Sequence, residues 1–168
     1  WARKYLKETS DTPWDWDVAP SYLEVSFSSV CNFKCSYCTP EVSSKWMEES
    51  VKHGPYNLEN TVFNDVQRLK ELNRMPIPDR EDNPYVDAWW AWWPELYPNL
   101  HTFRITGGEP LMNKNTFRTL DYIEENPNPN LNFAINTNLC LPDSIIDKTI
   151  AQMNRITASK SIKKLQIY

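Results

Sequence analysis

Apolar and polar residues alternate in four short segments of the chain, and such alternation predicts β-strands. The segments are residues 22–28, 101–106, 131–137 and 163–168. In the first segment Leu23, Val25 and Phe27 occupy every second position, so their side chains share one face of the strand. Each of the four segments is short enough to be one strand of a common sheet.

Three other segments carry apolar residues three or four positions apart, which predicts helices. They are residues 58–72 with Leu58, Val62, Val66 and Leu69, residues 115–125 with Phe117, Leu120 and Ile123, and residues 143–153 with Ile145, Ile146, Ile150 and Met153. Asn115 is a good helix-capping residue, so we expect it at the N-cap of the second helix. Strands and helices alternate, which predicts an α/β fold with about four parallel strands and crossover helices.

Residues 74–100 contain five prolines, which lack a backbone N–H, so we expect no long regular element there. The aromatic run Trp89–Trp93 within this segment could form a short amphipathic turn. Packing against the body of the protein is the ordinary role of such aromatics, and a substrate lid or partner surface is the alternative.

Residues 1–20 are expected to form an extended arm, and residues 126–130 a connector rich in turns.

The chain has 168 residues, of which 40% are hydrophobic, with 18 basic and 22 acidic side chains and a net charge of −4. These values predict a folded domain or part of a larger one, and they argue against a dedicated nucleic-acid binder. No apolar run approaches the roughly 18 residues of a membrane span, and no signal segment is visible, so we expect a cytoplasmic protein with no membrane partner. The chain begins at Trp1 and not at Met, and it ends at Tyr168 at the end of a predicted strand, so both ends look cut.

Three of the four cysteines, Cys31, Cys35 and Cys38, fall in one short loop after the first predicted strand. Three closely spaced thiolates suit an iron–sulfur cluster, in which each thiolate binds a different iron. A cluster of four irons would keep one iron open for a non-protein ligand. The alternative is a zinc site completed by Cys140 or His53, although structural zinc sites usually draw their ligands from two separated pairs.

A second motif, Gly107-Gly108-Glu109-Pro110, follows the second predicted strand. Adjacent glycines let a backbone approach a ligand closely. Glu109 would project an anionic acceptor from the carboxyl edge of the sheet, where parallel α/β folds bind ligands, and it would suit a substrate ammonium group. Taken alone, the motif also fits an ordinary strand-to-helix turn with a solvated glutamate.

Several other polar residues have both a functional and a structural interpretation. Asn136 and Asn138 end the third strand at the same sheet edge, where they could contact a ligand or simply form a turn. Cys140 is expected to be a spare buried thiol, with an extra metal ligand as the alternative. Arg104 could face inward as a cation or be paired and solvated. The features expected to be structural or exposed to solvent are His53, His101 and the charged run Asp79-Arg80-Glu81-Asp82.

The two motifs together resemble the radical S-adenosylmethionine (radical SAM) superfamily, whose fold is a partial or complete (β/α) barrel. In that family the three-cysteine loop follows the first strand and Gly-Gly-Glu-Pro follows the second, as they do here. Tyr37 matches the family's aromatic residue before the third cysteine. The resemblance covers about residues 22–168 and implies the N-terminal half of such a barrel. Residues 30–38 and 136–138 are similar to the branch that bears SPASM or twitch extensions.

The resemblance implies that Cys31, Cys35 and Cys38 ligate a 4Fe–4S cluster whose open iron binds the methionine part of S-adenosylmethionine (SAM). The remaining implied SAM-binding residues are Tyr37 beside the adenine, Gly107, Gly108 and Glu109 at the methionine ammonium, and Asn136 and Asn138. One-electron reduction would split SAM into methionine and a 5′-deoxyadenosyl radical, which abstracts hydrogen from a substrate that the sequence does not identify. A peptide or protein side chain is one candidate substrate, and flavodoxin or ferredoxin would be the electron donor. The alternative function is a non-catalytic module that holds zinc or an electron-transfer cluster.

Overall fold

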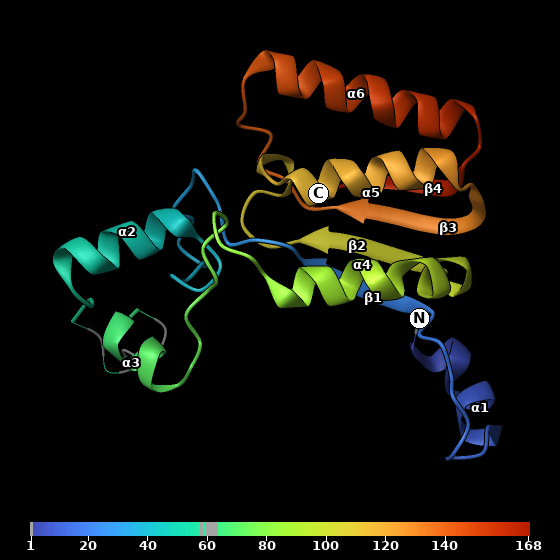
Figure 1. The fold of residues 1–168 in the computed structure, drawn as a ribbon, viewed down its shortest axis with the longest axis horizontal. Coiled ribbons are helices and arrows are strands. Elements are labelled where there is room, and N and C mark those ends of the chain that lie inside the picture. Colours follow the sequence, from blue (N-terminus) through green and yellow to red (C-terminus); the bar gives the residue numbers. More distant parts are fainter. Residues whose placement is uncertain (1, 58, 60–63) are drawn as a thin grey trace.

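A single four-stranded sheet organises the chain in the computed structural model, which describes residues 2–57, 59 and 64–168 (Figure 1). The strands are β1 (Tyr22–Ser26), β2 (Thr102–Thr106), β3 (Asn128–Ile135) and β4 (Ile162–Ile167). They lie side by side in chain order, and each neighbouring pair is parallel. The predicted fold class is therefore confirmed: the protein is α/β, with four parallel strands and interspersed helices, consistent with a partial (β/α) barrel.

Helices α4 (Pro84–Leu96), α5 (Lys114–Glu125) and α6 (Asp143–Ala158) pack against one face of this sheet. Helices α2 (Ser44–His53) and α3 (Val66–Glu71) lie beyond the arrowheads of the strands, at the carboxyl edge (Figure 1). Helix α1 (Ala2–Asp11) precedes β1, and two short 3₁₀ helices, η1 (Tyr97–Asn99) and η2 (Pro110–Met112), flank β2. No helix in the described ranges is long and apolar enough to cross a membrane.

The two faces of the sheet differ sharply in polarity. One face carries in-register rows of apolar side chains that pack under the helices: Leu23, Phe103, Phe133 and Leu165, and then Val25, Ile105 and Ile135. Because successive residues of a strand point to opposite faces, the neighbouring row lies on the other side. That row contains Glu24, Arg104, Ala134 and Gln166. The sheet therefore buries one apolar face and presents a mostly polar one.

The proline-rich segment contains helix α4, so the expectation that it holds no long regular element was wrong. Pro84 lies in the first helical turn, where the missing N–H has no intrahelical partner to lose, and the Asn83 side chain caps the helix by accepting from the backbone N–H of Tyr85. Pro94 lies near the end of the helix. Burial of Trp93 and Leu96 offsets its cost, because both are 0–1% exposed. Trp89, Trp90 and Trp93 of the tryptophan run thus pack in the core, as is ordinary for aromatics, and Trp92 is exposed.

Several predicted boundaries also shift. Helix α5 is capped by Asn113 and not by Asn115, because the Asn113 side chain accepts from the backbone N–H of Asn115 at 2.8 Å. Strand β3 begins inside the expected connector, at Asn128, whose backbone N–H donates to Ser161. In α6 the expected apolar stripe is partly wrong: Met153 is buried, but Ile150 is 52% exposed.

Two further expectations concern the N-terminal half. The arm over residues 1–20 was expected to be extended, but it contains helix α1. Of the helix expected over residues 58–72, only the second half is described, and there Val66–Glu71 is helical. Leu58 and Val62, which we expected on its apolar side, lie outside the described residues.

Candidate functional site

The clustered cysteines occupy the loop between β1 and α2, which we call the cysteine loop (residues 29–40). The start of α2 holds this loop in place. The Ser44 hydroxyl accepts from the backbone N–H of Cys31 and donates to its carbonyl, both at 3.0 Å. The Trp46 indole donates to the carbonyl of Cys35 at 2.9 Å, and the Ser43 hydroxyl donates to that of Phe33. The sequence pattern did not assign these residues to the site, although a serine pair before a helix is a usable capping signal.

The three cysteines of the loop are free thiols and half-buried. Burial raises the pKa of Cys38, and charge on Cys35 and Cys31 raises it further, so the three groups are close enough to interact electrostatically. The backbone N–H of Phe33 donates to Cys31 Sγ at 3.4 Å. In the described part of the chain, no three His, Cys, Asp or Glu side chains converge as they would around a single metal ion. Three soft thiols on one loop, one with an N–H directed at its sulfur, are a donor set that fits an iron–sulfur cluster.

Tyr37 lies on the outer side of this loop and is 85% exposed. Interaction with Cys35 raises the pKa of Tyr37. The side chain therefore lies near a cysteine and remains open to solvent. Its assignment to an adenine stays a prediction.

The loop after β2 packs directly on the cysteine loop, and its two glycines make this possible. The backbone N–H of Gly108 donates to Ser28 and that of Glu109 donates to Val30. A Cβ on Gly108 would lie 2.2 Å from the carbonyl oxygen of Val30. Gly107 has φ +113°, in the left-handed region that favours glycine, and a Cβ there would lie 2.4 Å from the Ser26 hydroxyl. The close approach that these glycines permit is thus to the neighbouring loop.

Glu109 is buried, with 2% of its surface exposed, and its carboxylate points into the protein. Oε1 accepts from the backbone N–H of Leu111 at 3.0 Å and from the hydroxyl of Thr137 at 2.6 Å. Oε2 accepts from the backbone N–H of Asn138 at 2.7 Å. An ionised carboxylate can accept about four hydrogen bonds, so these three leave capacity on Oε2. Glu109 joins the end of β2 to the segment after β3, and the interpretation as a solvated turn residue does not describe it.

The segment after β3 brings its two asparagines into different surroundings. The side-chain oxygen of Asn136 is buried and has no hydrogen-bond partner among the described residues. The side-chain amide of Asn138 donates to Asn32 at 2.9 Å and lies 4.0 Å from Cys31 Sγ. Cys140 is exposed, so the expectation of a spare buried thiol was wrong.

Arg104 lies on the polar face of the sheet. Its guanidinium sits over the ring of Tyr168, 4.9 Å from the ring centre, and its Nε lies 4.0 Å from a carboxylate oxygen of Glu24. It is therefore both on the face away from the helices and weakly paired. His53 ends α2, His101 precedes β2, and both are exposed.

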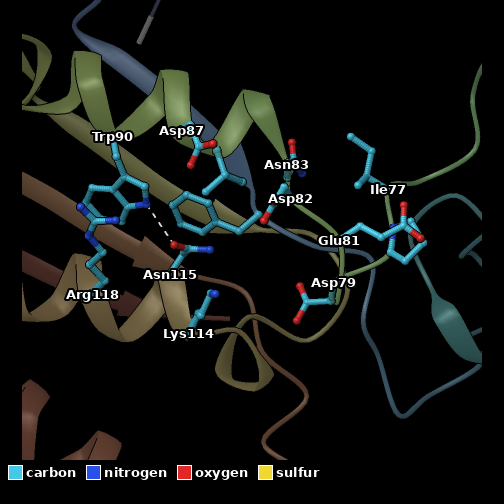
Figure 2. Close-up of a pocket in the computed structure, with 13 residues that line it drawn as sticks. Ile77, Asp79, Glu81, Asp82, Asn83, Asp87, Trp90, Lys114, Asn115 and Arg118 are labelled. Carbon is cyan, nitrogen blue, oxygen red and sulfur yellow. Dashed lines mark hydrogen bonds between the residues drawn. The ribbon is translucent and has the colours of Figure 1, made fainter.

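Figure 2 shows a pocket of 170 Å³ between the N-terminal parts of α4 and α5. Acidic side chains, among them Asp79 and Asp82, line one side, and Lys114 and Arg118 line the other. The Arg118 guanidinium stacks over Trp90, and the Asn113 side chain donates to Asp79 at 2.9 Å. The charged run at residues 79–82 is thus partly anchored. None of the lining residues belongs to the cysteine loop or to residues 107–110, so the pocket is separate from the candidate site.

Comparison with known proteins finds weak similarity to GTP 3′,8-cyclases. The chain is 24% identical to that of Syntrophomonas wolfei over 140 residues, which are 83% of this chain and 33% of that protein. It is 27% identical to that of Trichodesmium erythraeum and 29% identical to that of Desulforamulus reducens, each over 106 residues and 63% of this chain. No family model matches the chain, and no solved structure matches it.

The chain spans between 23% and 33% of the length of these curated relatives. This weak similarity supports the resemblance to the radical SAM superfamily that the two motifs carry.

Proposed function

We propose that this protein is a radical SAM enzyme that binds a 4Fe–4S cluster on the cysteine loop and SAM beside it. The observation that carries the proposal is the meeting of three loops at the carboxyl edge of the sheet. The cysteine loop, residues 107–110 and residues 136–138 are far apart in the sequence. Asn138 nevertheless joins them, because its backbone N–H donates to Glu109 and its side-chain amide donates to Asn32. Ligands bind at this edge in parallel α/β folds.

In this proposal Cys31, Cys35 and Cys38 hold the cluster through their thiolates. When bound, the cluster and SAM supply a one-electron reductive cleavage that generates a 5′-deoxyadenosyl radical for hydrogen abstraction. The remaining acceptor capacity of Glu109 Oε2 receives the methionine ammonium, and the Gly108 backbone borders the same group. Gly107 gives that loop its path, Tyr37 contacts the adenine, and Asn136 and Asn138 border SAM or the substrate.

The substrate lies over the polar face of the sheet, which the helices leave uncovered. Glu24, Arg104 and Gln166 form one in-register part of this face, so it favours a polar substrate over an apolar one. Resemblance to the SPASM and twitch branch favours a peptide or protein side chain. The relatives are named for a reaction of GTP, which makes a nucleotide the competing class. A flavodoxin or ferredoxin supplies the electron at the exposed outer side of the cysteine loop.

Anaerobic reconstitution of the purified protein with iron and sulfide tests this proposal. We expect about four irons and four sulfides per chain, and alanine in place of Cys31, Cys35 or Cys38 should abolish the visible absorption of the cluster. Cys140→Ala is the matched control, because this fourth cysteine is exposed and outside the loop, and it should retain full iron. After dithionite reduction with SAM, 5′-deoxyadenosine should form. A protein that binds one zinc and no iron would overturn the proposal in favour of a non-catalytic metal-binding module.

A further inference from the structure

Two asparagine side chains, Asn32 from the cysteine loop and Asn138 from the segment after β3, interlock beside Cys31. We propose that Asn138 is a positioning residue: it directs an amide N–H at Cys31 Sγ and thereby raises the reduction potential of the cluster. This inference rests on the proposed function. It assigns to Asn138 an action on the cluster through Cys31, besides its proposed place beside SAM or the substrate.

The orientation of the Asn138 amide follows from its neighbours. The backbone N–H of Cys140 donates to Asn138 Oδ1 at 2.8 Å. A backbone N–H can only donate, so the oxygen must face Cys140, and the NH₂ group must face the opposite way. One hydrogen of that group goes to Asn32 Oδ1 at 2.9 Å. The other is left for Cys31 Sγ, which lies 4.0 Å from the nitrogen.

Asn32 holds the same arrangement from the other side. Its NH₂ group donates to the carbonyl oxygen of Cys140, which can only accept, so its Oδ1 must face Asn138. Turning either amide over would set donor against donor or acceptor against acceptor. The two side chains therefore fix each other, and both are half-buried.

The backbone of Asn138 is fixed as well. Its N–H donates to the buried carboxylate of Glu109 at 2.7 Å, and Thr137 beside it donates to the same carboxylate. The amide that faces Cys31 is thus anchored to β2, β3 and the cysteine loop at once. Second-layer groups held in this way orient metal ligands and tune the metal.

A donor near a cluster sulfur stabilises the more negative, reduced form and so raises the reduction potential. Both N–H groups that the described residues direct at a cysteine sulfur go to Cys31, one from Phe33 at 3.4 Å and one from Asn138. The Phe33 donor belongs to the backbone and cannot be removed by substituting its side chain. Asn138 is the donor that a substitution can remove.

The test is a potentiometric titration of the reconstituted protein without SAM, followed by the electron paramagnetic resonance signal of the reduced cluster. Asn138→Leu keeps the approximate size and removes the donor. We expect iron content close to that of wild type, because Asn138 is not a cluster ligand. The equilibrium constant for reduction of the cluster should fall about tenfold. For a one-electron couple this is a fall of about 59 mV. Asn138→Asp keeps the acceptor for Cys140, removes the donor and adds a negative charge, so its potential should fall further.

Asn136→Leu is the matched control, since Asn136 also follows β3 but makes no side-chain hydrogen bond to a cysteine sulfur among the described residues. The reduction potential of this variant should equal that of wild type. If wild type and both Asn138 variants bind a cluster and all three have the same reduction potential, this inference is overturned. The proposed function would still stand in that case. If Asn138→Leu binds no iron, the reduction potential of Asn138→Asp is compared with that of wild type instead. A lower potential supports the inference, and an equal one overturns it. Absence of a cluster from the wild-type protein would overturn the proposed function and this inference with it.

Discussion

The carboxylate of Glu109, after β2, accepts a hydrogen bond from the hydroxyl of Thr137, after β3, at 2.6 Å. The same hydroxyl accepts from the backbone N–H of Leu139 at 3.1 Å. Glu109 is almost fully buried, so water does not compete with Thr137 for this hydrogen bond. The pair therefore connects two loops of the candidate site through a side-chain contact between residues 28 positions apart in the sequence.

Thr137→Val should destabilise the protein, because it removes a donor from a buried carboxylate while keeping the shape of the side chain. Hydrogen bonds to charged groups contribute about 1.5–3 kcal/mol, and we expect a loss in the free energy of unfolding of that size. Urea denaturation followed by circular dichroism measures it. Thr137→Ser keeps the hydroxyl and is the control; an equal loss in both variants would contradict a role for the hydrogen bond.

Glu109→Gln should weaken SAM binding, because it removes the charge proposed to pair with the methionine ammonium. A charge-assisted contact of roughly 1.5–3 kcal/mol corresponds to a loss of about tenfold or more in affinity. Isothermal titration of the reconstituted protein measures this, with iron content expected to be unchanged. Glu125→Gln, at the C-terminal end of α5, should bind SAM as wild type does. Undiminished affinity in the Glu109 variant would remove Glu109 from the SAM site.

Gly108→Ala should disturb the cysteine loop, since the added Cβ would lie 2.2 Å from the backbone oxygen of Val30. Overpacking of this kind costs about 1–3 kcal/mol, and it should also reduce iron loading. Gly54→Ala is the control: its φ of +80° makes alanine strained, but nothing lies within 4 Å of the new Cβ. We expect the control to lose roughly 1 kcal/mol of stability with iron loading intact. Equal iron loading in both variants would show that the two loops need not touch.

Trp93→Ala should cost about 3–5 kcal/mol of unfolding free energy, as large-to-small substitutions at buried aromatics do. Trp93 is fully buried, and its ring centre lies 4.8 Å from that of Phe103. The adjacent Trp92 is 45% exposed on the same helix, so Trp92→Ala should change stability much less. Thermal and urea denaturation of the two variants compares them directly, and similar losses would mean that α4 does not pack on the sheet through Trp93.

Stability should depend on pH through Glu124. Hydrogen bonds from Arg155, at 2.6 and 3.1 Å, hold the pKa of Glu124 below its ordinary value of 4.5. A lowered pKa in the folded state means stabilisation that is complete above pH 4.5 and is lost as the pH falls through the folded value. Glu124→Gln should therefore lower the melting temperature at pH 7 but not in strong acid. The control is Glu125→Gln, because Glu125 forms no ion pair in the described structure, and it should show no such difference.

Several features of the fold could be predicted because they depend on residues close together in the chain. Alternation located all four strands, and spacing of apolar residues located α5 and α6 to within a few residues at their starts. The prediction failed for α4, because proline was treated as excluding a helix wherever it occurs. Pro84 is compatible with a first turn, and burial of Trp93 supports the turn that contains Pro94.

The amino-acid sequence was enough to predict three thiols in one loop, a Gly-Gly-Glu-Pro motif after the next strand, and a parallel α/β order that brings both to one edge of the sheet. The inward direction of the Glu109 side chain, and the position of Asn138 beside Cys31, 107 positions away, became visible in the three-dimensional fold and not in the sequence. Local patterns encode backbone conformation through neighbours within a few residues. Hydrogen bonds between loops form where burial removes water, because buried donors and acceptors then need partners within the protein. Which groups become buried together depends on how the whole sheet is assembled.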